Sequence, residues 1–397
     1  MRVPLLDLSE QYRPLSGSIR AELEEILSSQ SFILGPKGEA FEEAIRSYCG
    51  SPNAIGVSSG TDALLALLMA LEIGPGSAVI TSAYSFFATA GCVARVGATP
   101  ILIDIDPETY NISAQALEDY LTGSCRPGEG DTLYTKSGEA VRAIIPVHLF
   151  GLCCEMNEIH RLAQTFRIQV IEDAAQAIGS EYLFEGKPAK AGTMGEAGCF
   201  SFYPSKNLSA AGDAGMVICR DDGLAQRLRA CRQHGMEPRY YHQFIGGNFR
   251  LDEIQAAVLK VKLPFLDQWS EARRKIADIY REEFGRLDAT QTVALPTEPY
   301  RKDGLVNHHT YHQYVIRSEQ RDALRDHLTR KEIGTAIYYP LALHEQECFS
   351  YLDYSAGDFP EAERAARGTL ALPMYPELTP DAQRYVVEAI AEFNRNR

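Results

Sequence analysis

The alternation of short apolar runs with amphipathic segments through the first two-thirds of the chain is the feature that most restricts its fold. The predicted strands cover residues 54–58, 77–83, 100–105, 141–149 and 168–171, and the predicted helices between them cover 62–71, 88–96 and 155–166. Strands separated by helices need crossover connections, so they form a mostly parallel sheet with helices on both faces. The sequence therefore predicts an α/β fold. Residues 121–139, rich in Gly, Thr and charge, are predicted to be a surface excursion.

A second, smaller α/β unit is predicted after this region. A long amphipathic helical pattern runs from Phe249 to about Phe284 and is expected to kink or break at Pro264. The pattern then resumes with a strand, a helix and a strand over residues 310–317, 320–331 and 334–339. We therefore expect a large α/β domain with an N-terminal helix over residues 1–264 and a small domain over residues 265–397.

Composition excludes several classes of protein. The chain of 397 residues is 45% apolar and 23% charged, which is typical of a globular protein and not of a disordered or fibrous one. The longest apolar run, residues 63–71, is less than half of the roughly 20 residues that a membrane span needs, so no membrane helix is expected. The net charge of −14 argues against nucleic acid as a partner, because phosphate backbones require clustered cations.

The N-terminus and the cysteines predict the cellular location. Pro4 and Asp7 stand where a signal peptide would need a continuous apolar core. The nine cysteines are scattered, and the pair Cys153 and Cys154 lacks the two-residue spacer of a redox or zinc motif. These features predict reduced, mostly buried thiols and a cytoplasmic protein.

Ligands of open parallel sheets lie at the carboxyl ends of the strands, so the residues after each predicted strand are the candidate site residues. Gly60 and Thr61 open a helix whose N–H groups suit a phosphate, with an ordinary Thr N-cap as the alternative. Phe86 and Phe87 either stack on a planar ligand or belong to the core. Asp173 ends an apolar strand, where a carboxylate needs a cation or hydrogen-bond donors, unless it caps the next helix.

The segment 198–208 is the most informative part of the chain. It is an aromatic-rich strand entering a turn that presents one lysine, Lys206, between Ser205 and Asn207. A lysine embedded there is a candidate for a lowered pKa and Schiff-base chemistry, with a surface loop position as the alternative. An anion-binding helix start, an aromatic plate, a carboxylate and a lysine are the groups that pyridoxal 5′-phosphate needs for its phosphate, ring face, pyridine nitrogen and aldehyde. Together they predict this cofactor.

Several longer motifs follow one another along nearly the whole chain. They are SGTDA at 59–63, SFFAT at 85–89, EDAAQ at 172–176, FSFYPSKNL at 200–208, GNFRLD at 247–252, IYYP at 337–340, His344 and LPMYP at 372–376. In order and spacing they resemble the DegT/DnrJ/StrS family of sugar aminotransferases. The resemblance implies the fold type I architecture of aminotransferases that use pyridoxal phosphate, a homodimer with shared active sites, and a nucleotide-linked ketosugar substrate.

The resemblance also implies roles for individual residues. Lys206 would form the Schiff base with the cofactor, and Asp173 would pair with the pyridinium nitrogen. The other implied roles are Gln176 at the ring hydroxyl, Gly60, Thr61 and Ser201 at the phosphate, Phe86 over the ring, Asn248 at the phosphate from the neighbouring subunit, Arg250 at the amino donor's carboxylate, and Tyr338 and His344 at the substrate.

The implied reaction moves an amino group from L-glutamate to a nucleotide-diphosphate ketosugar, through pyridoxamine 5′-phosphate, for glycan, lipopolysaccharide or antibiotic biosynthesis. The residues around Lys206 favour amination at C-3, with a C-4 ketosugar or a keto-inositol as alternatives. Ile178, where many members carry His, and the pair 210–211 border the sugar pocket and leave the substrate open. A sugar dehydratase of this family would replace the lysine by His. A non-catalytic regulator would be expected to lose Lys206, Asp173 or Gln176, and all are present.

Three other features of the sequence bear on the substrate and on other classes of function. A basic patch is predicted to meet the substrate's diphosphate, with a helix of solvated arginines as the alternative; it comprises Arg227, Arg229, Arg232, Arg239 and Arg250. His308, His309 and His312 are not expected to bind a metal, because on a strand they would alternate between faces. A nicotinamide oxidoreductase is disfavoured, because the glycine fingerprint of dinucleotide binding is absent.

Overall fold

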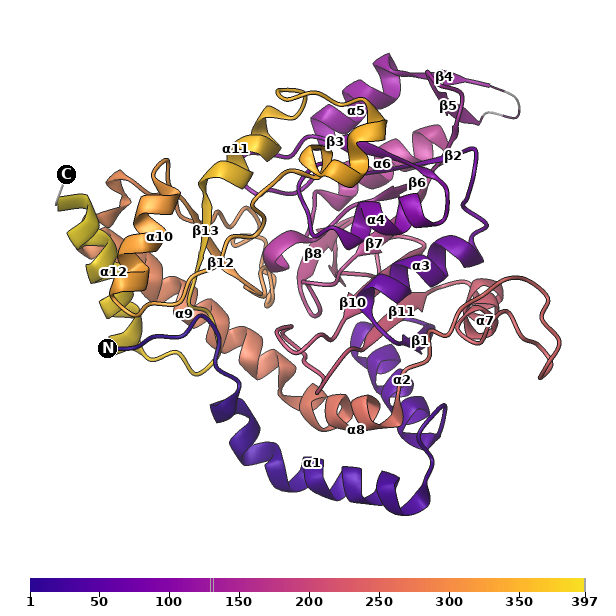
Figure 1. The fold of residues 1–397 in the computed structure, drawn as a ribbon, viewed down its shortest axis with the longest axis horizontal. Coiled ribbons are helices and arrows are strands. Elements are labelled where there is room, and N and C mark those ends of the chain that lie inside the picture. The colour runs from indigo at the N-terminus through magenta and orange to yellow at the C-terminus, as the bar shows by residue number, and fades with distance from the viewer. Residues whose placement is uncertain (129, 131, 396–397) are drawn as a thin grey trace.

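The computed structural model describes residues 1–128, 130 and 132–395, and a nine-stranded mixed sheet lies at its centre (Figure 1). The order along the sheet is β1-β11-β10-β7-β6-β2-β3, and β5 joins β4 to the edge of β6. The strands are β1 (Asn53–Val57), β2 (Ser77–Ser82), β3 (Thr99–Ile103), β4 (Cys125–Pro127), β5 (Leu133–Thr135), β6 (Ala140–Ile145), β7 (Gln169–Asp173), β10 (Ala197–Ser201) and β11 (Gly215–Cys219).

Strand direction decides where the functional residues gather. The neighbours β10, β7, β6, β2 and β3 are parallel, whereas β11 is antiparallel to both β10 and β1. The carboxyl ends of β1, β2, β7 and β10 therefore meet the start of β11 at one edge of the sheet. The predicted α/β fold with a mostly parallel sheet is confirmed.

Helices cover both faces of this sheet, because successive strand residues point to opposite sides. In β7, Val170 belongs to one buried apolar cluster and Ile171 to the other, and Ile144 and Ile145 of β6 divide in the same way. The helices in this part of the chain are α1 (Ser9–Ser29), α2 (Pro36–Cys49), α3 (Gly60–Ala70), α4 (Ala88–Arg95), α5 (Ala114–Gly123), α6 (Met156–Phe166), α7 (Asp222–Cys231) and α8 (Glu253–Lys262).

The C-terminal part begins with a break in the helical pattern at Pro264, as predicted. A 3-10 turn, Leu263–Phe265, separates α8 from the next helix. The elements that follow are α9 (Leu266–Arg286), β12 (Tyr314–Arg317), α10 (Arg321–Arg330), α11 (Pro360–Gly368), β13 (Thr369–Leu372) and α12 (Pro380–Arg395). β12 and β13 form an antiparallel pair. The N-terminus lies beside this part (Figure 1), where Val3 bridges Ile333. The division at residues 264 and 265 stays a proposal.

The strand predicted over residues 334–339 is wrong. Only Ala336 forms a bridge, with Ala371. The Tyr84 hydroxyl donates to the carbonyl of Tyr338 at 2.6 Å and accepts from the N–H of Tyr339 at 2.7 Å. A buried side chain therefore takes the backbone bonds that a strand would have made, and the segment turns toward the sheet edge.

Two small hairpins add detail that the sequence pattern does not predict. Where the predicted surface excursion 121–139 is described, it contains the end of α5 and the antiparallel pair β4 and β5. A second small hairpin, β8 (Glu181–Phe184) with β9 (Lys187–Lys190), follows β7. Among the described residues no helix is long and apolar enough to cross a membrane.

Candidate active site

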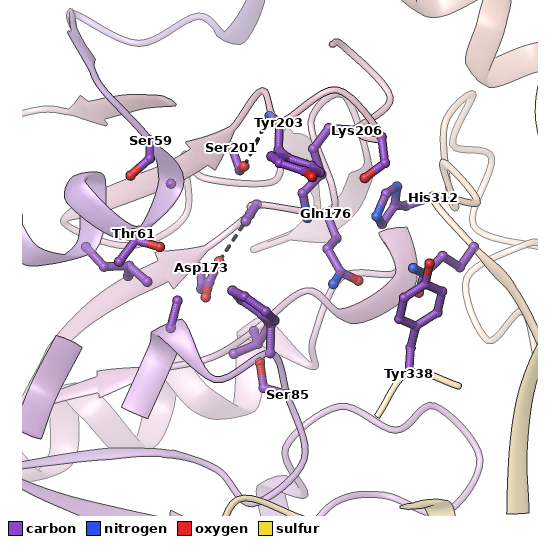
Figure 2. Close-up of a pocket in the computed structure, with 18 of the residues that line it drawn as sticks. Ser59, Thr61, Ser85, Asp173, Gln176, Ser201, Tyr203, Lys206, His312 and Tyr338 are labelled. Carbon is purple, nitrogen blue, oxygen red and sulfur yellow. Dashed lines mark hydrogen bonds between the residues drawn. The ribbon is translucent and has the colours of Figure 1, made fainter. Parts of the chain in front are cut away.

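A cavity of about 540 Å³ opens at the edge of the sheet where the strand ends meet (Figure 2). Segments that follow β1, β2, β7 and β10 form one side, and segments of the C-terminal part close the other. Its lining includes Ser59, Gly60, Thr61, Ser85, Phe86, Asp173, Gln176, Ser201, Tyr203, Lys206, Asp213, His312, Gln313, Tyr338 and Tyr339. The structure thus brings together most of the residues that the motifs single out.

The N-terminus of α3 forms an anion-binding end of the cavity. Ser59 is the N-cap, and its side chain accepts from the N–H of Asp62 at 3.0 Å, so Thr61 is not the cap. Gly60 lies so close to β10 that a Cβ there would stand 2.6 Å from the Cβ of Ser201, which explains the glycine. Backbone N–H groups of the first turn of α3 and the hydroxyls of Thr61 and Ser201 therefore lie at the same end of the cavity, where a phosphate fits.

Asp173 lies at the end of β7 and is 5% exposed. Its carboxylate accepts from the Thr89 hydroxyl at 2.8 Å and from the N–H of Ala175 at 3.2 Å. Figure 2 shows the place of Asp173 in the cavity. Burial raises the pKa of Asp173, and these donors together with Lys206 oppose the shift. A turn and not a helix follows Asp173, so helix capping does not explain it. The buried carboxylate of Asp173 needs a cation beside it, and a protonated pyridine nitrogen is such a cation.

Gln176 has a fixed amide orientation. Its Oε1 accepts from the N–H of Phe150 at 2.7 Å, which directs Nε2 to donate to the Tyr339 hydroxyl at 2.9 Å. The ring of Phe86 is 55% exposed and its centroid lies 5.9 Å from that of Tyr339. The open face of Phe86, the Gln176 amide and the Tyr339 hydroxyl therefore surround a part of the cavity that suits a planar ring.

Lys206 lies in the turn after β10, where its backbone N–H donates to the carbonyl of Tyr203 at 2.8 Å. Burial lowers the pKa of Lys206 to about 8, and the nearby Asp173 opposes that shift. A larger fraction of the amine is therefore neutral, and nucleophilic, at physiological pH than for an ordinary lysine.

Comparison with known proteins decides the family. Residues 15–391 match the model of the DegT/DnrJ/EryC1/StrS aminotransferase family. The chain belongs to this family.

Two curated relatives of this family member differ in the role their names state. A "Pleiotropic regulatory protein" from Geobacillus stearothermophilus is 46% identical over 396 residues, which cover 100% of both chains. A UDP-N-acetyl-3-dehydro-alpha-D-glucosamine 3-aminotransferase from Acidithiobacillus ferrooxidans is 40% identical over 376 residues, covering 95% of this chain and 94% of the relative.

Solved structures share the fold, and one of them carries a bound cofactor. An aminotransferase of the family from Brucella abortus superposes with a TM-score of 0.88 at 36% identity, covering 99% of each chain. NtdA from Bacillus subtilis, solved with the bound cofactor pyridoxamine phosphate, gives a TM-score of 0.85 at 29% identity, covering 99% of this chain and 85% of NtdA. The cofactor is pyridoxal phosphate. The anion cradle, the buried carboxylate and the lysine of the cavity fit its phosphate, ring nitrogen and aldehyde.

Three predicted residues of this aminotransferase lie outside the cavity. Asn248 bridges Gln233 in the segment between α7 and α8, which projects from the body in Figure 1. Arg250 bridges Val57, and its buried Nε has no hydrogen-bond partner among the described residues. The resemblance places Asn248 in a neighbouring subunit's site and Arg250, two positions on, near the amino donor's carboxylate, and both roles stay predictions. His344 is buried against Glu363, at 3.2 Å, and does not line the cavity of this chain.

Two of the five arginines of the predicted basic patch are not free cations, and the contact of the patch with the substrate's diphosphate stays a prediction. Arg227 donates to the carbonyl of Ala70 at 2.9 Å and pairs with Glu72. Arg232 pairs with Glu42 and is 8% exposed. These two arginines have internal partners, and no member of the patch lines the cavity.

Sequence reasoning missed His312, Gln313 and Tyr339 as lining residues. The predicted strand began at residue 310, but β12 starts at Tyr314, so the residues before it are irregular and do not alternate. His308 consequently bonds Glu298, and His312 reaches the cavity. The aromatic and polar run before β12 was the available signal.

Proposed function

We propose that this protein transfers the amino group of L-glutamate to C-3 of a ketosugar carried by a nucleotide diphosphate. The observation that carries the proposal is one cavity in which the anion cradle at α3, the buried Asp173 and the lowered-pKa Lys206 meet. The curated relative from A. ferrooxidans named as a 3-aminotransferase of a UDP-linked sugar supports C-3 as the position aminated.

The residues of the cavity divide the work of the reaction. Bound pyridoxal phosphate supplies a ring that takes up the negative charge developing on the donor's α-carbon. Asp173 would hold the ring nitrogen in its protonated form, and the N-terminus of α3 would anchor the phosphate. The Nζ of Lys206 would remove the proton from the donor's α-carbon as a general base and deliver it to the cofactor carbon that bears the transferred nitrogen. In the second half-reaction the same Nζ would take that proton back and deliver it to C-3 of the sugar.

A regulatory role without catalysis is the competing proposal, because one relative is named a regulatory protein. A protein that had lost the chemistry would not need a lysine, a carboxylate and an anion site in one cavity. This chain keeps Lys206, Asp173 and Gln176 there. Lys206 also argues against a sugar dehydratase.

A homodimer with shared sites is part of the proposal. The segment between α7 and α8 exposes Tyr240 by 73%, Tyr241 by 71% and Ile245 by 88%, a large apolar surface that a second copy could cover. Asn248 and Arg250 follow in this segment and would enter the partner's site. All nine cysteines are free, which supports a reducing compartment such as the cytoplasm.

The test follows the visible absorbance of the lysine-bound cofactor. We expect L-glutamate to abolish the band and a 3-keto nucleotide sugar, drawn from a panel that includes 4-keto sugars, to restore it. No loss of the band with any amino donor would refute the aminotransferase proposal. Restoration by a 4-keto sugar alone would move the site of amination to C-4.

A further inference from the structure

His312 is the histidine of the cavity that the proposed reaction does not use. It belongs to the irregular segment before β12 and is 7% exposed. In Figure 2 its ring stands between Lys206 and Tyr338, on the side of the cavity away from Thr61 and Asp173. The cofactor's phosphate and ring nitrogen would bind on that opposite side, beside Thr61 and Asp173, which leaves the side of His312 for the substrate.

The hydrogen bonds of Asn207 fix the tautomer of this histidine. The Nδ2 of Asn207 donates to the carbonyl of Thr310 at 2.9 Å, which leaves its Oδ1 as an acceptor 3.1 Å from the Nδ1 of His312. Nδ1 of His312 therefore carries the hydrogen, and Nε2 of the neutral ring carries a lone pair. Nε2 has no hydrogen-bond partner among the residues that the structure describes.

Arg273 of α9 holds the backbone of the same segment. The guanidinium is 3% exposed, and its Nη1 donates to the carbonyls of Tyr311 at 3.0 Å, His312 at 3.4 Å and Met374 at 3.1 Å. A buried cation that bonds three carbonyls is costly to move. The position of the His312 ring is therefore set before any ligand binds.

The surroundings keep the ring neutral. Burial lowers the pKa of His312 well below its usual value, and the nearby cations Lys206 and Arg273 lower it further. A neutral ring with Nδ1 occupied can only accept at Nε2. Its partner must be a donor.

We propose that the Nε2 of His312 accepts a hydrogen bond from a hydroxyl or amide N–H on a sugar carbon next to the reacting carbonyl. The inference rests on the proposed function, because the reacting carbon must come to Lys206 and its neighbouring substituents then face His312. It also sets a requirement on the substrate class: a sugar that lacks a donor on that carbon leaves a buried acceptor unpaired.

The test separates the two half-reactions in His312→Phe and His312→Gln. For the Phe variant we expect the KM for the ketosugar that restores the wild-type band to rise about 10- to 100-fold. The single-turnover rate with L-glutamate should fall by less than about 3-fold, because no sugar is present in that step. The Gln variant keeps an acceptor oxygen and should recover part of the loss. His309→Gln, a buried histidine outside this cavity, is the matched control.

Two results would overturn the inference. One is a ketosugar KM in His312→Phe that equals that of the wild type. The other is an equal loss in both half-reactions, which would give His312 a role in folding or at Lys206. If wild-type protein does not respond to any amino donor, the proposed function fails first, and binding of the nucleotide aminosugar product, compared by calorimetry between wild type and His312→Phe, then decides on His312 alone.

Discussion

Within the cavity, the pKa values of two residues are shifted in opposite directions. Burial lowers the pKa of Lys206 to about 8 and raises that of Asp173, and each group opposes the shift of the other. Both charged forms are disfavoured until a ligand brings the missing charge. The site is therefore suited to a cofactor that has an aldehyde for the amine and a protonated nitrogen for the carboxylate.

Replacement of Lys206 tests its role as the proton carrier. We expect Lys206→Ala to lower kcat by at least about 10³-fold, because both half-reactions lose their general base and acid. The cofactor should remain bound without a covalent link, held by its phosphate and ring contacts. Lys275→Ala, on the exposed surface of α9, is the control and should keep wild-type turnover. Full activity in Lys206→Ala would contradict the mechanism.

The lowered pKa of Lys206 predicts how binding of the cofactor depends on pH. Only the neutral amine attacks an aldehyde, and its fraction rises as pH rises through the pKa. Because burial places that pKa at about 8, the rate at which the visible band appears after adding pyridoxal phosphate should rise between pH 7 and 9 and then level off. A rate that continues to rise toward pH 10.5 would indicate an ordinary, solvated lysine.

The sequence identified some of these residues and missed others for a physical reason. Asp173 ends β7 and Lys206 lies in the turn after β10, so local pattern and the rule for parallel sheets place them at the sheet edge. His312 depends on Arg273 and Asn207, which lie far from it in sequence. No local pattern shows that those contacts keep its segment out of a strand.

At the scale of elements, the start of α2 depends on one buried carboxylate. Glu253, the first residue of α8, is 0% exposed and accepts from the N–H groups of Gly35 at 3.0 Å, Lys37 at 2.8 Å and Gly38 at 2.7 Å. These donors are the ones that a helix N-terminus leaves unpaired. A side chain of one helix therefore caps another and joins the two.

We predict that Glu253→Ala lowers the free energy of unfolding by roughly 3 kcal/mol, because buried donors lose a charged acceptor. Glu253→Gln should lose less, since one amide oxygen can still accept. Glu271→Ala, at an exposed position of α9, should change stability by less than about 0.5 kcal/mol. Denaturant titration measures all three variants. Equal stability of Glu253→Ala and wild type would show that water replaces the cap.

Apolar pattern predicted the central elements well and the small peripheral ones poorly. The centres of buried strands are apolar, as Val170 and Ile171 are in β7, so these strands stand out from the sequence. The hairpin of β8 and β9 is short and mostly half-buried, so it carries no such signal. The false strand at 334–339 is apolar too, but its backbone bonds go to Tyr84, a partner that local pattern cannot reveal.

At the scale of the whole molecule, the net charge of −14 does not describe the site, because the anion cradle is built from backbone N–H groups and hydroxyls at α3. The remaining predicted contacts, Asn248 and Arg250, would depend on a second copy of the chain if the proposed homodimer forms. Assembly is therefore part of the proposed function.

Mixed dimers test whether Asn248 acts across the interface. Lys206→Ala and Asn248→Ala chains, co-expressed with different tags, form mixed dimers that contain one intact site if Asn248 belongs to the partner's site. We expect each variant alone to be impaired and the equal mixture to regain about a quarter of wild-type activity, from random pairing. No gain over the variants alone would place Asn248 in its own chain's site or outside both.

The central claim is that this protein moves an amino group from glutamate to C-3 of a nucleotide-linked sugar. The most direct measurement is a turnover with ¹⁵N-labelled L-glutamate and a 3-keto nucleotide sugar, followed by NMR of the product. We expect ¹⁵N bonded to C-3 of the sugar and an equal amount of unlabelled 2-oxoglutarate. Label that stays in glutamate in the presence of bound cofactor, or that appears at C-4 of the sugar, would contradict it.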